Sequence, residues 1–416
     1  MQILQLVAKA LVQIHTTFQQ ENMVNEKENS IKVLRIINRF NLGGPIFNVT
    51  MLTKYLPPVY QTTLVGGSPL AQEQSAIYIL DEYLINGIVI PEMTRKISFI
   101  GDLVALYKLI KIIKIEQPTI VHTHASKAGS LGRIAAKLMG VKIIVHTFHG
   151  NVFSGYFNGF ISNLLVKFER HLAKSSSAII AISEQQKKEL VNTYRIAKSE
   201  KIHIIPLGFD LTKFLQNDTY RISTRKRLAI ENEIIAVSLV GRITAIKNHA
   251  LFIEAAAITL KQHPDKFKFY IVGDGELKQD LVHYIKTQFP SIIPHIIFTS
   301  WIKDMEQFYS AMDIVCLTSK NEGTPVTLIE AQASGKPVIS TNVGGVVDVV
   351  KNLETGFIME GFDPNELSKH MINLYLNEHL RTKMSQNARN FVKDQFSYRR
   401  LVNDMDKLYK SLLSNA

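Results

Sequence analysis

The chain has 416 residues, a formal net charge of +12 and a single cysteine. This length exceeds what one ordinary hydrophobic core organises and predicts two large domains. A hydrophobic content of 46% with 20% charged residues excludes a disordered or fibrous protein. The lone Cys316 excludes an intramolecular disulfide and a multi-cysteine metal site, and it is typical of a reducing, cytoplasmic compartment.

Positive charge is concentrated in the first half of the sequence. Residues 1–215 contain 24 Lys and Arg against 14 Asp and Glu, whereas the rest contains 24 against 22. Such a surface could attract nucleic acid, anionic lipid or a phosphorylated substrate, and charge alone does not distinguish among these partners. No segment predicts a membrane span or a cleaved signal peptide, and residues 1–30 are interpreted as a loosely ordered leader.

From Lys32 onward, short β-branched runs alternate with helical patterns, which is typical of parallel sheets covered by helices on both faces. The first series of expected strands is Val33–Ile37, Thr119–His124, Ile143–Thr147, Ala178–Ile182 and Ile202–Ile205. The second is Ile235–Val240, Lys268–Val272, Ile296–Thr299, Ile314–Thr318 and Val338–Ser340. The sequence therefore predicts an α/β fold of two Rossmann-like, doubly wound domains facing a cleft.

The expected domains are residues 31–207 and 208–396, because the strand series restarts after Pro206-Leu207-Gly208. The chain from Pro364 to the end is predicted to be helical, with a break between Gln395 and Ser397. We expect residues 397–416 to form a helix that returns to the N-terminal domain.

The strongest local motif is Ser319-Lys320-Asn321-Glu322-Gly323-Thr324-Pro325, which precedes a helix carrying Glu330. Thr324 is expected to be the N-cap and Pro325 the first helical residue, with Gly335 at the stop. A helix N-terminus directly after a strand favours anions. Glu322 and Glu330 are eight positions apart and can therefore contact different parts of one ligand.

A second motif runs from Gly241 to Asn248 and follows a buried strand. Its cations, Arg242 and Lys247, stand at the carboxyl end of that strand, where open α/β sheets bind ligands. Two fixed cations can stabilise the charge that develops on a diphosphate leaving group without a metal ion.

Together with Val272-Gly273-Asp274-Gly275, Trp301 and Gly344-Gly345, these motifs resemble retaining glycosyltransferases of family 4, which have the GT-B fold. The resemblance extends from about Val33 to Val350. It implies that Arg242 and Lys247 hold the donor diphosphate, Glu330 the ribose and Glu322 the donor sugar, with no metal or other cofactor. The donor-binding residues it implies are Gly43, Gly44, Gly241, Gly273, Trp301, Gly323, Thr324, Pro325 and Glu330.

In the first domain, Asn41-Leu42-Gly43-Gly44 resembles the family's glycine loop beside the donor phosphates, where glycine permits close backbone approach. His149-Gly150 resembles the family histidine that contacts the donor sugar near the reacting carbon. The neighbouring histidines are taken as structural, since their spacing is not that of a zinc site: His122, His124 and His146. The expected catalytic residues are His149, Arg242, Lys247 and Glu322.

Other functions remain as alternatives. The glycine loop lacks the third spaced glycine of a dinucleotide-binding fingerprint, and no basic run interleaved with aromatics favours nucleic-acid binding. A nucleotide-sugar epimerase or hydrolase could use the same fold.

The expected donor is a nucleotide diphosphate sugar, with UDP as the favoured nucleotide. Ser126-Lys127-Ala128-Gly129 resembles bacterial transferases that use polyprenyl diphosphate acceptors in envelope polysaccharide synthesis. Lys108, Lys111 and Lys114, with Ile97, Ile100, Val104 and Ile110 nearby, predict peripheral docking on the inner face of a bacterial plasma membrane.

Overall fold

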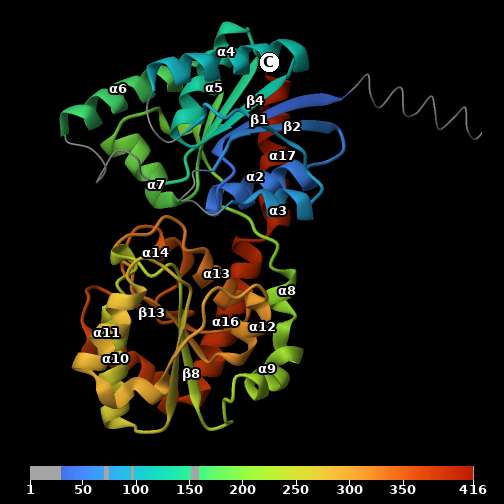
Figure 1. Cartoon of the computed structure of the whole chain (residues 1–416). Helices are drawn as coiled ribbons and strands as arrows, with labels where there is room; N and C mark the ends of the chain where they lie inside the picture. Colours follow the sequence, from blue (N-terminus) through green and yellow to red (C-terminus); the bar gives the residue numbers. More distant parts are fainter. Residues whose placement is uncertain (1–29, 70–74, 95–97, 151–158, 416) are drawn as a thin grey trace, which may run out of the picture. The chain divides into compact units, whose positions relative to one another are not determined.

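A computed structural model describes residues 30–69, 75–94, 98–150 and 159–415 (Figure 1). The first unit contains the described residues up to Ala181, Glu189–His203 and the chain from Val402 onward. The second contains Ile182–Lys188 and Ile204–Leu401. The expected leader, residues 1–30, lies outside the described residues except for Ser30.

The first unit is built on a seven-stranded sheet in the order β3-β2-β1-β4-β5-β6-β7. Its strands are β1 (Ile31–Arg39), β2 (Tyr60–Gly67), β3 (Gly87–Val89), β4 (Ile120–His124), β5 (Ile143–Thr147), β6 (Ala178–Ala181) and β7 (Ile202–Ile204). The order reverses between β1 and β4, which pair in parallel with Arg35 beside His122 and Ile37 beside His124. A ligand site is expected at this switch point, at the carboxyl ends of the strands.

Helices cover the strands of the first unit, with α4 and α5 packed together and α2 beside α3 (Figure 1). Their bounds are α2 (Gly44–Tyr55), α3 (Ile77–Glu82), α4 (Phe99–Glu116), α5 (Ser126–Leu138) and α6 (Gly159–Ser175), whereas α7 (Glu184–Lys188) is grouped with the second unit. Strand alternation sends Ile36 and Val121 into the core under α4 and α5, and Ile37 into the core under α2 and α3.

The second unit has a six-stranded sheet in the order β10-β9-β8-β11-β12-β13. Its strands are β8 (Ile235–Val240), β9 (Phe267–Val272), β10 (Ile296–Phe298), β11 (Ile314–Leu317), β12 (Val338–Thr341) and β13 (Gly356–Met359). All its described pairings are parallel. The predicted α/β fold with two parallel sheets is confirmed.

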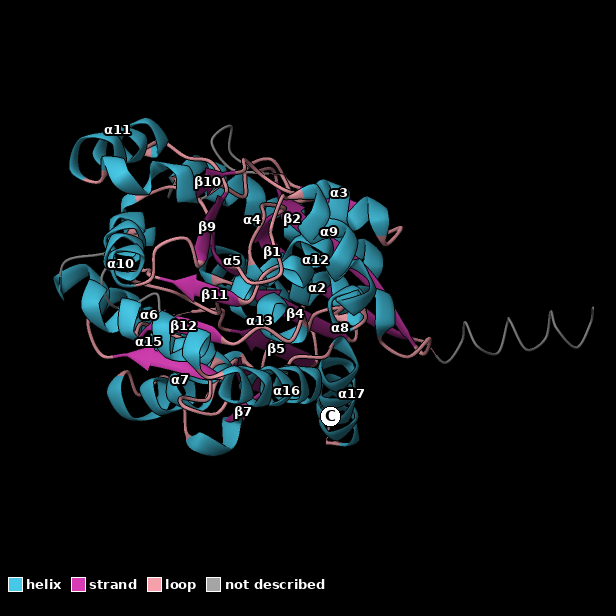
Figure 2. Ribbon diagram, turned by 90° about the horizontal axis from the view of Figure 1, so that it is seen from below, coloured by secondary structure: helices cyan, strands magenta, loops and turns pink. Residues whose placement is uncertain are grey.

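The helices of the second unit lie on both faces of its sheet, with α10 packed along α15 on one of them (Figure 2). Their bounds are α8 (Thr212–Leu215), α9 (Arg221–Arg227), α10 (His249–Gln262), α11 (Lys278–Gln288), α12 (Met305–Ala311), α13 (Val326–Ala333), α14 (Val346–Val349), α15 (Pro364–Leu376) and α16 (Glu378–Gln395). A last helix, α17 (Tyr398–Ser414), begins in the second unit and ends in the first. The helical C-terminal region and its break after Gln395 are as predicted.

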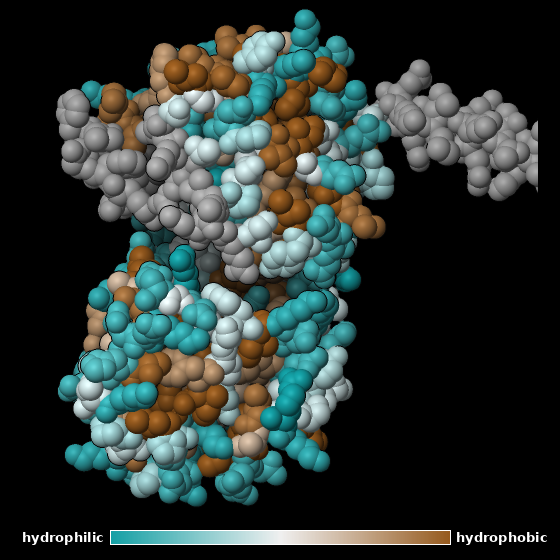
Figure 3. Space-filling model, viewed as in Figure 1, coloured by the Kyte–Doolittle hydropathy of each residue, from teal (hydrophilic) through white to brown (hydrophobic). Residues whose placement is uncertain are grey.

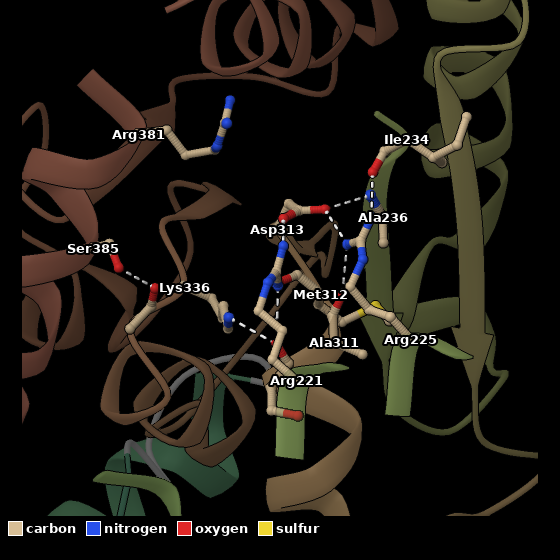
Figure 4. Close-up of polar contacts among 12 residues, drawn as sticks. Arg221, Arg225, Ile234, Ala236, Ala311, Met312, Asp313, Lys336, Arg381 and Ser385 are labelled. Atoms are coloured by element: carbon tan, nitrogen blue, oxygen red, sulfur yellow. Dashed lines mark hydrogen bonds and ion pairs between the residues drawn. The ribbon is translucent and has the colours of Figure 1, made fainter. Parts of the chain in front are cut away.

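A buried ion cluster anchors α9 to the amino end of β11 (Figure 4). Asp313 lies 2.6 Å from the Arg221 guanidinium and 3.0 Å from that of Arg225, and it accepts a hydrogen bond from the backbone N–H of Ala236. Burial alone would raise the pKa of Asp313, but the two arginines lower it. The cluster lies at the opposite end of β11 from Glu322, so we regard it as structural.

Candidate active site

The predicted donor residues of the second unit lie on loops that follow β8, β9, β10 and β11, except for Glu330, which lies in α13. These strands are neighbours, and the sheet order reverses between β8 and β11. The loops after those two strands are joined at the switch point, since the backbone N–H of Lys320 donates to Ile246 and the Thr318 hydroxyl donates to the Lys247 carbonyl. Loops at this position are where open α/β sheets bind ligands.

Lys247 and Glu322 form a direct ion pair across these two loops. The Lys247 ammonium donates to Glu322 Oε1 over 2.5 Å, and the Ser319 hydroxyl donates to the same oxygen over 2.6 Å. The side chains are 23% and 11% exposed, respectively. The lysine is therefore held in place by a carboxylate that is itself fixed, while remaining open to a ligand.

Arg242 stands apart from this pair. Its guanidinium lies 3.6 Å from the Glu276 carboxylate, and both side chains are more than half exposed. This contact is longer than a hydrogen bond and is screened by solvent. Arg242 can thus turn toward an anion at little cost.

Close backbone contacts fix the shape of the loops. An ideal Cβ at Gly344, whose φ is +51°, would lie 1.8 Å from the Glu322 carbonyl oxygen, and the Gly345 N–H donates to Gly323. At Gly273, whose φ is +136°, a Cβ would lie 2.1 Å from the Gly241 carbonyl oxygen. Glycine is therefore the only residue that can occupy positions 344 and 273 without a clash.

Trp301 lies close to Gly273, because a Cβ at that glycine would be 3.5 Å from indole Cη2. The residue is 51% exposed. An exposed indole can stack against a flat ring such as a nucleobase.

The helix after the β11 loop begins one residue later than predicted. Pro325 is the N-cap rather than the first helical residue, its carbonyl accepts from Leu328 N–H, and Thr324 makes no side-chain cap. The prediction of a Thr324 cap was wrong because Pro325 itself, at ψ 91°, supplies the extended turn into the helix. Gly335, at φ +65°, ends the helix as expected.

Glu330 lies inside α13 and interacts with Tyr309 on α12 rather than with Lys247 or Glu322. Burial raises the pKa of Glu330 to about 8, although the hydrogen bond with Tyr309 lowers it. A carboxyl with a pKa raised in this way can be protonated near neutral pH, and it then donates as well as accepts a hydrogen bond.

In the first unit, the glycine loop leads directly from β1 into α2. Gly44 is the first residue of α2, Pro45 follows it, and the Gly43 carbonyl accepts from Ile46 N–H. The loop carries no side-chain cap, so the first N–H groups of α2 are not satisfied by a capping side chain. It lies at the switch point of the first sheet.

His149 follows β5, and its Nε2 lies 2.9 Å from Nδ1 of His124 at the end of β4. Burial lowers the pKa of His149 to about 3, and it holds the pKa of His124 well below its ordinary value. Both imidazoles are neutral at physiological pH. Among the described residues, Nδ1 of His149 and Nε2 of His124 have no hydrogen-bond partner.

A polar network continues beneath this pair. His122 Nδ1 lies 2.7 Å from the Tyr409 hydroxyl of α17, and His122 Nε2 lies 2.8 Å from the Thr147 hydroxyl. Arg35, which is fully buried, donates to the Tyr409 oxygen over 3.3 Å. The side chains of His122 and His124 share one face of β4 with Arg35, as two-residue alternation requires.

His146 belongs to the opposite face of the sheet. Its Nδ1 contacts the Thr123 hydroxyl, and a Cβ at Gly129 would lie 2.4 Å from its ring. His146 is therefore structural, as predicted. Within the described residues, no group of three or more His, Cys, Asp or Glu side chains is arranged to hold a metal ion.

Sequence reasoning missed the network around His124. It treated His122 and His124 as structural residues and did not consider Arg35 or Tyr409. The alternation of the two histidines at the end of a strand was visible and would have placed both on one face. The contact with Tyr409 was not, because this tyrosine is 287 residues away.

Two doubly wound parallel sheets, with the Lys247–Glu322 ion pair at the switch point of the second, are the architecture of GT-B glycosyltransferases. A galactosyltransferase of Escherichia coli that uses UDP-Gal and α-D-GlcNAc-diphosphoundecaprenol is 32% identical over 81% of this chain and 87% of its own. The capsular polysaccharide glycosyltransferase CapM of Staphylococcus aureus is 30% identical over 79% of this chain and 86% of its own. Anabaena HepE, solved with UDP, superposes with a TM-score of 0.78 at 19% identity, covering 92% of this chain and all of its own.

Family models agree with this assignment. Residues 221–391 match glycosyl transferases group 1, and residues 52–213 match glycosyltransferase family 4. The chain belongs to the family 4 glycosyltransferases, and the predicted family and GT-B fold are confirmed.

Proposed function

We propose that this enzyme transfers a sugar from a UDP-sugar to a lipid-linked acceptor in envelope polysaccharide synthesis, with retention of anomeric configuration and without a metal ion. The observation that carries the proposal is the Lys247–Glu322 pair at the switch point, with Arg242 on the same loop as Lys247. The acceptor class is inferred from the relative that acts on a diphosphoundecaprenol-linked sugar.

Each part of the donor has a residue of suitable chemistry. Lys247 and Arg242 neutralise the diphosphate as the glycosidic bond breaks, which is the work a divalent ion does in other transferases. Trp301 and the backbone beside it lie near the base, and Glu330 contacts the ribose. Glu322 positions Lys247 and the donor sugar, and His149 of the first unit contacts the sugar near its reacting carbon.

Four measurements test the reaction. Among uridine, guanosine and adenosine diphosphate sugars, a UDP-sugar should raise the melting temperature most. Product NMR should show the donor's anomeric configuration. Chelator should leave the rate intact, and activity that vanished with chelator and returned with magnesium would refute the metal-free mechanism. Turnover of the donor without any acceptor would favour an epimerase or hydrolase instead.

Attachment to an anionic membrane is the second part of the proposal, and α4 carries it. Its outer face exposes Phe99, Ile100, Leu103 and Tyr107, and the first two are 81% and 76% exposed. Apolar side chains are prominent where α4 forms the edge of the first unit (Figure 3). Lys111 and Lys114 are exposed on the same helix, an arrangement typical of interfacial helices.

Some residues expected on this face have other roles. Lys108 pairs with Glu92 at 2.6 Å, and Ile110 packs against the core, so both already have partners within the first unit. Ile97 lies outside the described residues. No helix in the described ranges is long and apolar enough to span a bilayer.

Sedimentation with anionic vesicles at low and high salt tests this surface. We expect salt-sensitive binding that Phe99→Ser weakens and that Lys111→Glu with Lys114→Glu abolishes, since each cation contributes about 1 kcal/mol near an anionic surface. Leu376→Ser, at an exposed leucine of α15, is the matched control. Failure to bind at low salt, with efficient transfer to a soluble sugar, would overturn the lipid-acceptor proposal but not the transferase.

A further inference from the structure

Arg35 is a buried cation whose charge no carboxylate of the described residues balances. Its side chain extends from the middle of β1 and has an exposed fraction of 0%. A guanidinium remains protonated in proteins, so its burial leaves a full positive charge inside the first unit. Buried charges are normally paired, because an isolated ion loses its hydration without compensation. Arg133, which is also 0% exposed, follows this rule and pairs with Glu169 at 2.6 Å.

The described parts of the chain give Arg35 a single polar contact. Its Nη2 donates to the Tyr409 hydroxyl over 3.3 Å, whereas Nε and Nη1 have no hydrogen-bond partner there. Burial raises the pKa of Tyr409 in spite of the arginine, so the phenol is neutral. Asp406, one turn earlier on α17, accepts from Tyr60 at 2.9 Å and pairs with Lys410 at 2.7 Å. Neither group of α17 therefore balances the guanidinium.

The histidines of β4 do not balance it either. His122 is the partner of Arg35 in the register of β1 and β4. Burial, together with the Arg35 cation, holds the pKa of His122 well below its ordinary value, and burial does the same for His124. Both imidazoles are neutral, and neither can carry a negative charge at physiological pH.

An unpaired hydroxyl of α2 belongs to the same layer of the first unit. Thr50 is 0% exposed, and its Oγ1 has no partner among the described residues. It follows Ile46 by one helical turn, and Ile46 lies in the core cluster that contains Ile37 and Leu64. Leu64 is the partner of Arg35 in the register of β1 and β2, so Arg35, Ile37 and Leu64 share one face of the sheet. Arg35 and Thr50 therefore bring unpaired donors to the layer between α2 and the sheet.

We propose that a single-atom anion, chloride in the first instance, binds in this layer to the Nε–H and Nη1–H groups of Arg35, with the Thr50 hydroxyl as a further donor. The charge of the anion balances the guanidinium, which a water molecule cannot do. Enclosure limits its size: a nucleotide or lipid phosphate carries a substituent that must lead to solvent, and neither side chain has any exposed surface.

This anion is a structural ligand and is separate from the proposed transfer reaction. Arg35 also donates to Tyr409, and the Tyr409 hydroxyl lies 2.7 Å from His122 Nδ1. By fixing Arg35, the anion stabilises the contact of α17 with β1 and β4.

Crystals of the full chain grown with sodium bromide in place of chloride provide the direct test, because bromide scatters anomalously. We expect an anomalous peak within hydrogen-bond distance of Arg35 Nε and Nη1. Water alone beside the guanidinium, or a carboxylate of the chain paired with it, would overturn the proposal.

Melting curves at constant ionic strength test the site in solution, with sodium gluconate replaced stepwise by sodium chloride. At a chloride concentration about four times Kd, the Tm should be raised by roughly 2–4 °C, because the anion binds only the folded state. A Tm that does not depend on chloride would contradict the proposal.

Two variants locate the effect at this site. Arg35→Met removes the charge but keeps an aliphatic stem, and it should abolish the dependence of Tm on chloride. Thr50→Val removes one donor with little change in shape, and it should raise the chloride concentration at half-maximal shift several-fold. Lys142→Met, which removes an exposed cation of the first unit, is the matched control and should respond as wild type.

A wild-type chloride response in Arg35→Met would place the anion elsewhere and overturn the assignment. If Arg35→Met does not fold, the response of Thr50→Val decides in the same way, and the bromide crystals need no variant.

Discussion

Replacement of Lys247 by methionine removes the ammonium while keeping most of the aliphatic stem, which passes within about 3.6 Å of the place a Gly241 Cβ would occupy. The substitution therefore tests charge rather than packing. It leaves Glu322 with the Ser319 hydroxyl as its remaining side-chain donor in this contact.

We expect Lys247→Met to lower both the stability of the protein and its turnover number. A partly buried carboxylate deprived of one donor costs about 1–3 kcal/mol of stability, which lowers Tm by roughly 2–12 °C in a domain of this size. If Lys247 also stabilises the leaving diphosphate, kcat should fall by about 10²–10³, equivalent to about 2.7–4 kcal/mol.

Initial rates of nucleoside diphosphate release at saturating donor measure kcat directly. Lys261→Met, at an exposed lysine of α10, is the control and should behave as wild type. The double variant with Glu322→Gln should recover some of the lost Tm, since no unpaired carboxylate remains. A kcat for Lys247→Met within twofold of wild type would refute the leaving-group role.

Three further outcomes follow from backbone and burial. Burial raises the pKa of Glu330 from 4.5 to about 8, so wild type should lose stability relative to Glu330→Gln as the pH rises from about 4.5 to 8. A Tm difference between the two proteins that did not grow over this pH window would contradict the raised pKa. Ala125, whose φ is 64°, is strained, and Ala125→Gly should relieve about 1–3 kcal/mol of backbone strain, whereas the added entropy of the unfolded chain costs about 0.5–1 kcal/mol. The Tm of this variant should therefore rise, and a lower Tm would show that no strain is stored at Ala125. Gly344→Ala should lower the free energy of unfolding by about 2 kcal/mol or more and reduce kcat by displacing Glu322. Gly361→Ala, where a Cβ meets nothing within 4 Å, should do neither.

Local rules were enough to identify most strands and the loops that carry the site. Buried parallel strands such as β8 and β11 are continuous apolar runs, and the polar residues that follow them mark their carboxyl ends. The strands β3 and β13, which contain three and four residues and lie at the edges of their sheets, were not predicted. Strands as short as these, such as β10 and β11, were predicted.

Tertiary structure decided how the site residues are used. The sequence by itself determined that Lys247 and Glu322 stand on loops after strands, whereas the fold decided that they bind each other, because pairing depends on the order of β8 and β11 in the sheet. The burial that raises the pKa of Glu330 has the same origin in packing. The contact between His122 and Tyr409 of the last helix has no local pattern behind it, because only the assembled fold brings these two residues together.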